Sequence, residues 1–356
     1  MSRRTGDSTY ISAVTSPTKF LCIRLTALGD MVVTTPVYRA LKQQLGAEVH
    51  VLTRPGTAQM LSGNPHVDVI LNYEQPDLIG KLRSEGYDLV IDLHCNARSH
   101  KLRLALGLPV VGYYKRNIDK LLLRRGINRF GQEHLVHRYF KALAPLGIRY
   151  DGEGLDYFIA ADERESAREA VAAAGRKQRV DLSGPWTAMV IAGTHFTKRM
   201  PASLILKVIE HSEQPIVLLG GPDVAELAAE VEARASGKRL INLVNQLPLR
   251  VSCAVLAEAE SVIATDTGLM HVAAALRKPI VAVWGSTAPP YGMYPFVPEA
   301  HASSIRHAEV EGLGCHPCSK IGYPACPRGH FRCMHDQRPA EIAAAARELV
   351  WQNVEG

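Results

Sequence analysis

The sequence predicts an α/β protein made of two doubly wound parallel-sheet domains. Short runs rich in Val, Ile and Leu, typical of strands buried on both faces, alternate with segments of helical periodicity. The alternation occurs twice, and the polar segment 162–185, with Gly and Pro near its end, separates the two series. A chain of 356 residues is also longer than one compact core usually covers.

The first half contains four strand patterns and one clear helix pattern. The helix, "PVYRALKQQLG" (36–46), has Pro near its start, and apolar residues recur at helical spacing along it. The predicted strands are "FLCIRL" (20–25), "EVHVLT" (48–53), "VDVIL" (67–71) and "YDLVIDLH" (87–94).

The second half repeats the pattern with more elements. The predicted strands are "TAMVIAG" (187–193), "PIVLLGG" (215–221), "RLINLV" (239–244), "SVIAT" (261–265) and "PIVAVWG" (279–285). The predicted helices are "PASLILKVIEH" (201–211), "DVAELAAEVEARA" (223–235), "VSCAVLAEAE" (251–260) and "LMHVAAAL" (269–276).

The composition shifts suggest four parts. Residues 1–18 are predicted to be a flexible leader, residues 19–175 the first domain and residues 185–336 the second. In residues 337–356, the helix 339–354 is expected to pack back towards the first domain. The leader is basic but lacks the apolar core of a signal peptide, and no run is long and apolar enough to span a membrane, so we expect a cytoplasmic protein.

Positive charge is concentrated between residues 96 and 150. That segment has twelve Lys and Arg residues against two acidic ones, Asp119 and Glu133. Such an excess favours an anionic partner, which the pattern leaves open as a phosphorylated substrate, an acidic membrane surface or nucleic acid. The alternative is an ordinary solvated face.

Asp30 is the first candidate for chemistry. Ligands of open parallel sheets bind outside the carboxyl ends of the strands, and two such domains would form a cleft between them. Asp30 follows the strand 20–25 and should face that cleft, with Gly29 permitting the sharp turn. There the carboxylate could accept a proton from an attacking hydroxyl. It could equally be a helix N-cap that only holds the helix start.

The second domain has an anion-binding pattern after the strand 261–265. Asp266, Thr267 and Gly268 precede a helix of small residues, so free backbone amides and a hydroxyl would meet a ligand at a helix N-terminus. A diphosphate would fit there, and His271 could reach the same ligand. Another small, polar turn, 285–287, follows the next strand.

Two further turns follow strands of this domain. "IAGTHFTKRMP" contains Thr194, Thr197 and Lys198, and a lysine in such a loop can neutralise charge on a leaving phosphate, although a surface lysine is the alternative. In "LLGGPDVAE", Asp223 or Glu226 could bind ribose or sugar hydroxyls or cap the next helix.

Neither a G-x-G-x-x-G after the first strand nor a P-loop motif is present, which argues against a dinucleotide dehydrogenase and a P-loop NTPase.

Taken in order, these segments resemble a known family. "IRLTALGDMVVTTPV", "DLVIDLHCNARS", "GGPD" and "DTGLMHVAAALRKPIVAVWGST" are similar to the lipopolysaccharide heptosyltransferases of glycosyltransferase family 9. The resemblance implies the GT-B architecture, with two Rossmann-like domains facing across a cleft. It also implies inverting, metal-independent transfer of heptose from ADP-heptose to the lipopolysaccharide inner core, with Kdo-lipid A or heptosyl-Kdo-lipid A as acceptor.

The resemblance also assigns roles to residues. The first domain would bind the acceptor and the second the nucleotide sugar. Asp30 matches the general base and Lys198 the lysine at the donor phosphates. Cys95 departs from the family pattern, which often has Gly there. The donor-binding block corresponds to Asp266, Thr267, Gly268, Leu269 and His271, and the acceptor candidates are Arg98, His134 and Arg138.

The partners implied by the resemblance are an ADP-sugar donor, a phosphorylated, Kdo-bearing lipid acceptor and the anionic inner face of the cytoplasmic membrane. The basic stretch "DKLLLRRGINRF" (119–130) would lie against that surface. No cofactor is expected for catalysis, and no nucleic acid as a partner. Rival interpretations are a related transferase with another nucleotide sugar, a non-catalytic member of the family and a nucleic-acid-binding protein with a zinc cluster.

Four of the seven cysteines lie close together near the end of the second domain. The spacing is typical of structural zinc, although the second pair is C-x₆-C, and reduced packed thiols and disulfides stay open. Cys22, Cys95 and Cys253 lie in apolar runs and are expected in the core. The members of this cysteine cluster are Cys315, Cys318, Cys326 and Cys333.

Overall fold

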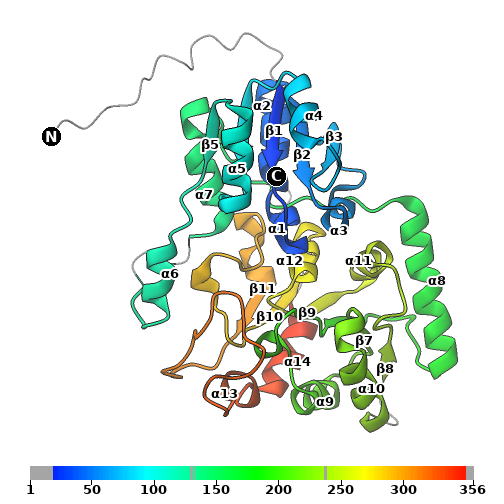
Figure 1. Cartoon of the computed structure of the whole chain (residues 1–356). Coiled ribbons are helices and arrows are strands. Elements are labelled where there is room, and N and C mark those ends of the chain that lie inside the picture. The colour runs from blue at the N-terminus through cyan, green and yellow to red at the C-terminus, as the bar shows by residue number, and fades with distance from the viewer. Residues whose placement is uncertain (1–18, 129–130, 132, 236–238, 350–356) are drawn as a thin grey trace. The chain divides into compact units, whose positions relative to one another are not determined.

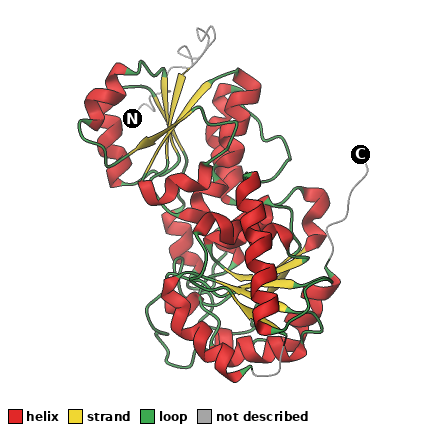
Figure 2. Ribbon diagram, turned by 90° about the vertical axis from the view of Figure 1, so that its right-hand side faces the viewer, coloured by secondary structure: helices red, strands yellow, loops and turns green. Residues whose placement is uncertain are grey.

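The computed structural model describes residues 19–128, 131, 133–235 and 239–349. The predicted leader, residues 1–18, lies outside them. The chain divides into two units, of which the first contains residues 1–115 and 135–151 and the second residues 116–134 and 152–356. Each unit has its own parallel sheet with helices on both sides (Figures 1 and 2).

The first unit contains a five-stranded parallel sheet in the order β3-β2-β1-β4-β5. This is the strand order 3-2-1-4-5 of a doubly wound fold, in which the switch point lies between the first and fourth strands. Ile23, the last residue of β1, is level with Leu52 of β2 and with Asp92 of β4. The strands are β1 (Lys19–Ile23), β2 (Glu48–Thr53), β3 (Val69–Asn72), β4 (Leu89–Asp92) and β5 (Val110–Gly112).

Helices cover this sheet because their apolar faces are complementary to it. In α2 the buried residues run from Thr35 to Leu41, Pro36 stands in the first turn, and Gly46 ends the helix in the left-handed conformation, at φ 61°. Leu21, Ile23 and Val90 are among the fully buried centre of the core. The helices are α1 (Leu28–Val33), α2 (Thr35–Leu45), α3 (Pro55–Ala58), α4 (Leu78–Ser84), α5 (Ala97–Leu106) and α7 (Leu135–Leu143), with 3₁₀ turns at Gln59–Leu61 and Ala144–Leu146.

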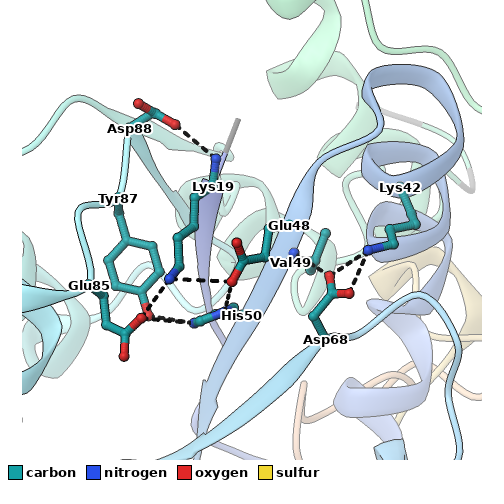
Figure 3. A network of polar contacts seen from close by, with 9 residues as sticks. All are labelled: Lys19, Lys42, Glu48, Val49, His50, Asp68, Glu85, Tyr87 and Asp88. Atoms are coloured by element: carbon teal, nitrogen blue, oxygen red, sulfur yellow. Dashed lines mark hydrogen bonds and ion pairs between the residues drawn. The ribbon is translucent and has the colours of Figure 1, made fainter. Parts of the chain in front are cut away.

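A polar network ties together the amino ends of β1 and β2 (Figure 3). Lys19 Nζ lies 2.6 Å from Glu85 and 3.3 Å from Glu48. His50 contacts both the Glu48 carboxylate, at 2.7 Å, and the Tyr87 hydroxyl, at 2.9 Å. Because the strands are parallel, this network lies at the edge opposite to the one where ligands of such sheets bind, and we assign it a structural role.

The second unit contains a six-stranded parallel sheet in the order β11-β10-β9-β6-β7-β8. Read from β8, this is the order 3-2-1-4-5-6, and the switch point lies between β6 and β9. The strands are β6 (Thr187–Val190), β7 (Ile216–Leu219), β8 (Leu240–Asn242), β9 (Ser261–Thr265), β10 (Ile280–Val283) and β11 (Ile305–Ala308).

The helices of the second unit include all four that were predicted between residues 201 and 276. They are α6 (Asn117–Leu123), α8 (Ala161–Gln178), α9 (Ala202–His211), α10 (Ala225–Arg234), α11 (Leu249–Glu258), α12 (Gly268–Ala275), α13 (Arg332–His335) and α14 (Pro339–Glu348). The 3₁₀ turns are Phe196–Lys198, Pro222–Val224, Pro289–Tyr291 and Glu299–Ser304.

Two features of this division differ from the sequence prediction. The helix α8, expected at the end of the first domain, packs instead against α11 of the second unit. Arg164 and Arg168 of α8 contact the Glu258 carboxylate of α11 at 3.1 and 2.8 Å, and Arg250 of α11 contacts Glu163 at 2.6 Å. These ion pairs join α8 to α11 of the second unit.

The C-terminal helix also differs from the expected return to the first domain. Its described part, α14, packs on α9 and on the central strands of the second unit, where Figure 1 shows it in red. Ile342, Ala343 and Ala346 are buried in the core of that unit. This apolar stripe fits the second sheet, and residues 350–356 lie outside the described residues.

Among the described residues, no helix combines the length and the apolar character that crossing a membrane requires.

Candidate active site

In the first unit, the residues that follow β1 and β4 meet at the switch point. Arg24, directly after β1, is only 6% exposed. Its guanidinium donates to the carbonyl oxygen of Leu93 at 2.5 Å, to that of Thr26 at 2.8 Å and to the hydroxyl of Tyr139 at 3.1 Å. Arg24 therefore joins the loops after the two strands and places a positive charge between them.

Asp30 is held by this arginine. The Asp30 carboxylate forms an ion pair with Arg24 and accepts a hydrogen bond from the backbone N–H of Ala27 at 3.1 Å. Asp30 is the third residue of α1 and Ala27 is the N-cap, so the acid supports the helix start without being the N-cap itself. Its side chain remains 23% exposed, which leaves carboxylate surface available to a substrate.

The expected role of Gly29 in a sharp turn is wrong. Gly29 is the second residue of α1 and is buried, and it does not have the positive φ that makes glycine necessary. The turn residue with a left-handed conformation follows β4 instead: Cys95 has φ 47°. A glycine would adopt this conformation without strain, so Cys95 occupies a position that favours glycine.

The acceptor candidates lie on separate elements of the two units. Arg98 is exposed in the first turn of α5. Arg138, on α7, is 5% exposed, and its charge acts on the pKa of Tyr113, which burial raises. His134 belongs to the second unit and is fully buried. Its ring stacks on Phe296 at 4.4 Å, and its Nε2 lies 3.1 Å from the carbonyl oxygen of Tyr294.

In the second unit, the turns after β6 and β9 meet at the other switch point. Lys198 Nζ, from the turn after β6, lies 2.9 Å from a carboxylate oxygen of Asp266, which follows β9. The two side chains are 16% and 13% exposed. The ion pair fixes the ammonium group beside the start of α12, where free backbone amides point outward.

The N-terminus of α12 carries the rest of the predicted donor block. Thr267 is its N-cap, and the Thr267 hydroxyl is buried without a hydrogen-bond partner among the described residues. Gly268 is the first helical residue, and Leu269 and His271 are 8% and 2% exposed. Because a buried hydroxyl without a partner carries a free-energy cost, the site is suited to a ligand that supplies the missing acceptor.

Hydrogen bonds between Thr197 and two other loops of the second unit hold the Lys198 turn in place. The Thr197 hydroxyl accepts from the backbone N–H of Tyr323 at 2.7 Å and bonds to the Ser286 hydroxyl at 2.9 Å. The N–H of Ser286 donates to the Thr197 carbonyl oxygen at 3.0 Å. At Gly285 a Cβ atom would lie 2.4 Å from that oxygen, so only glycine permits this approach. The predicted turn 285–287 thus belongs to the site.

The other three residues predicted to bind the nucleotide sugar are exposed. Thr194 and Glu226 are exposed, and Glu226 stands in the first turn of α10. Asp223 forms an ion pair with Arg199 at 2.8 Å, and Arg199 also donates to the Asp223 carbonyl oxygen at 2.9 Å. Asp223 thus holds the loop after β6 to the loop after β7.

The cysteine cluster consists of free thiols. No three His, Cys, Asp or Glu side chains among the described residues are arranged to hold a metal ion, and structural zinc at this cluster stays a prediction from the cysteine spacing. Burial and the neighbouring thiols raise the pKa of Cys333 to about 12, which is typical of a packed, unreactive thiol.

Sequence reasoning missed Arg24 and His94. Both follow strands that flank the switch point, and His94 is buried at 7% exposure. The available signal was their position: each is the first or second polar residue after a buried strand. We expect ligand contacts at such positions in doubly wound sheets.

Comparison with known proteins identifies the family and the fold. The sequence model of glycosyltransferase family 9 (heptosyltransferase) matches residues 77–321. Lipopolysaccharide heptosyltransferase 3 of Escherichia coli K12 is 26% identical over 286 residues, which are 73% of this chain and 80% of that protein.

Two solved structures share the fold. The ADP-heptose LPS heptosyltransferase II of E. coli has a TM-score of 0.69 at 20% identity, covering 93% of this chain and 98% of that one. The E. coli heptosyltransferase WaaC, solved with ADP, has a TM-score of 0.57 at 21% identity, covering 81% of this chain and 92% of that one. The predicted GT-B type of fold is confirmed. Since the family match covers more than half of the chain, the protein is a glycosyltransferase that belongs to family 9, the heptosyltransferases.

Proposed function

We propose that this glycosyltransferase moves heptose from ADP-heptose to the inner core of lipopolysaccharide, with inversion and without a metal ion in catalysis. Its acceptor would be Kdo-lipid A or heptosyl-Kdo-lipid A. The observation that carries the proposal is the Lys198–Asp266 ion pair beside the N-terminus of α12. A diphosphate is stabilised by a fixed cation, free amides and a hydroxyl donor, and this turn offers all three.

The two units supply different parts of the reaction. In the second unit, Lys198 and the amides after Asp266 would stabilise the negative charge that develops on the departing ADP. Thr267 would donate its unpartnered hydroxyl to a phosphate oxygen. In the first unit, Asp30 would take the proton from the acceptor hydroxyl as that hydroxyl attacks the anomeric carbon from the face opposite ADP.

An anionic membrane surface is part of the proposal. The helix α6 exposes Ile118 and Leu121, which are 66% and 49% exposed, next to basic residues such as Lys120 and Arg124. Apolar side chains among cations favour binding to an anionic leaflet. The protein would then work at the cytoplasmic face of the inner membrane. Residues 129 and 130 of the predicted stretch lie outside the described residues.

The decisive experiment is an ADP-release assay with ADP-heptose and Kdo₂-lipid A. We expect release that depends on both substrates and a heptosylated product of inverted anomeric configuration. ADP-hexoses and UDP-sugars are the matched donor controls. Turnover with one of those donors and none with ADP-heptose would favour a related transferase with another sugar.

The membrane component has its own test, which is sedimentation with anionic and with neutral vesicles. Binding to anionic vesicles should weaken as salt rises, because screening shortens the reach of the Lys and Arg charges. Binding that is indifferent to salt would exclude this electrostatic attachment.

A further inference from the structure

The turn after β4 is built around a buried carboxylate. Asp92, fully buried at the end of β4, accepts hydrogen bonds from the backbone N–H groups of His94 at 3.0 Å and Cys95 at 2.7 Å. These bonds fix the backbone on both sides of the imidazole. The His94 ring is therefore held at the switch point between β4 and β1 rather than on a mobile loop.

Asn96 determines which nitrogen of His94 carries the hydrogen. As the N-cap of α5, its side-chain oxygen accepts from the N–H groups of Arg98 at 2.9 Å and Ser99 at 3.1 Å. The amide nitrogen of Asn96 must then face His94, whose Nε2 it contacts at 2.6 Å. An amide nitrogen only donates, so Nε2 accepts and the hydrogen of the neutral imidazole is on Nδ1.

That Nδ1–H group is buried and has no hydrogen-bond partner among the described residues. Burial, with the charges of Arg24 and Lys115, lowers the pKa of His94 to about 4, so the ring is neutral near pH 7. An unpaired buried donor is costly and points to an acceptor atom that a ligand supplies.

Besides His94 Nδ1–H, the ammonium group of Lys115 is a second polar group near the end of β4 without a partner among the described residues. It follows β5, which is next to β4 in the sheet, and it is half-buried. It forms no hydrogen bond or ion pair with any residue that the structure describes. The neighbouring charges are already matched, since Arg24 pairs with Asp30 and Arg103 lies 3.5 Å from Asp92. The ammonium group of Lys115 is therefore a positive charge without a paired carboxylate in the described part of the chain.

We propose that His94 and Lys115 form an oxyanion subsite at the switch point of the first unit, which binds the carboxylate of an acidic sugar in the acceptor. One carboxylate oxygen accepts from His94 Nδ1–H and the other faces the Lys115 ammonium. A single unmatched cation suits a monoanion, so a carboxylate is favoured over a phosphate. The inference rests on the proposed function, because it names how the acceptor is held next to Asp30.

The test measures binding of free Kdo, an acidic sugar, to the full-length protein by calorimetry or ligand-observed NMR. Its neutral analogue, with the carboxylate reduced to an alcohol, and inorganic phosphate are the two comparison ligands. His94→Ala and Lys115→Gln should each weaken Kdo binding by about tenfold or more, as expected for a lost hydrogen bond to a charged group. Binding of the neutral analogue should be weak and unaffected by either change.

Conservative variants and a matched control separate recognition from damage to the fold. His94→Gln keeps an N–H donor and Lys115→Arg keeps the charge, so both should restore most of the affinity. Lys81→Gln removes an exposed lysine elsewhere in the same unit and should behave as wild type. In turnover with a Kdo-bearing acceptor, Lys115→Gln should raise KM and leave kcat nearly unchanged.

Kdo binding that is unchanged in both His94→Ala and Lys115→Gln would overturn the subsite. Phosphate binding as tight as that of Kdo would overturn its assignment to a carboxylate. Kdo binding can be measured without turnover, so the binding assay and the ADP-release assay give independent results. Failure of the proposed function would appear as absent ADP release with Kdo binding intact.

Discussion

Acidification should destabilise this protein through His94, and the effect can be measured against His94→Gln. The pKa of His94 is lowered from 6.5 to about 4 by burial, and then by the charges of Arg24 and Lys115. Asp92 and Asp30 face the same ring and act in the opposite direction, but they do not cancel the shift. The imidazole therefore stays neutral in the folded protein over a pH range in which the unfolded chain takes up a proton.

The size of the loss in unfolding free energy follows from how far the pKa of His94 is lowered. Each pKa unit corresponds to about 1.4 kcal/mol, so a shift from 6.5 to about 4 amounts to roughly 3 kcal/mol. Below pH 6.5 the unfolded state binds more protons than the folded state, so the free energy of unfolding falls as the pH drops. The loss is complete near pH 4, below which both states are protonated.

The assay is urea unfolding of wild type and variants at about pH 7 and about pH 4.5, with the change in unfolding free energy compared between them. His94→Gln has no titrating group at this position, so it should lose up to about 3 kcal/mol less than wild type on acidification. His100→Gln, which removes an exposed histidine of α5, is the matched control and should follow wild type. NMR titration of the His94 ring gives its pKa directly.

Two results would refute this reasoning. One is a His94 titration with a midpoint near its ordinary value. The other is an identical pH dependence of stability in wild type and His94→Gln. Either would mean that the ring is solvated and takes up a second proton at mildly acidic pH.

Four further predictions address the site. Asp30→Asn should lower turnover by about 10²–10⁴, the usual contribution of a general base, while calorimetry finds unchanged ADP binding; near-normal turnover would exclude the base role. Lys198→Met should lower turnover by about 10²–10³ and weaken ADP binding, whereas Lys207→Met, on the exposed face of α9, should do neither. Gly285→Ala should cost about 1–3 kcal/mol in unfolding free energy, because its Cβ would lie 2.4 Å from the Thr197 carbonyl oxygen, and it should also weaken ADP binding. Chelators should leave the thermal unfolding midpoint unchanged if the cysteine cluster consists of packed thiols, as its lack of three grouped metal ligands within the described residues favours; a lowered midpoint or stoichiometric zinc in purified protein would establish the structural zinc that the spacing predicts.

The elements that can be predicted from the sequence are those with a strong local pattern. All nine predicted strands are present, and the helices α2, α9, α10, α11 and α12 lie within a few residues of their predicted bounds. Short edge strands such as β5 and β11 were missed. Their residues are only partly buried, so they lack the continuous apolar run that marks a central strand. Asp30, Lys198 and Asp266 were selected as candidates because each follows such a run.

What the sequence could not give is the set of contacts between residues far apart along the chain. The Lys198–Asp266 pair exists because β6 lies beside β9, and the unpaired Nδ1 of His94 lies near Arg24 because β4 lies beside β1. Whether His134 meets a ligand or an aromatic ring is decided in the same way, by the packing of distant segments. Periodicity records which face of an element is buried, and so it determines helices, strands and the turns between them. Strand order and packing decide which of those turns meet, and therefore where the charges and unpaired donors of a site come together.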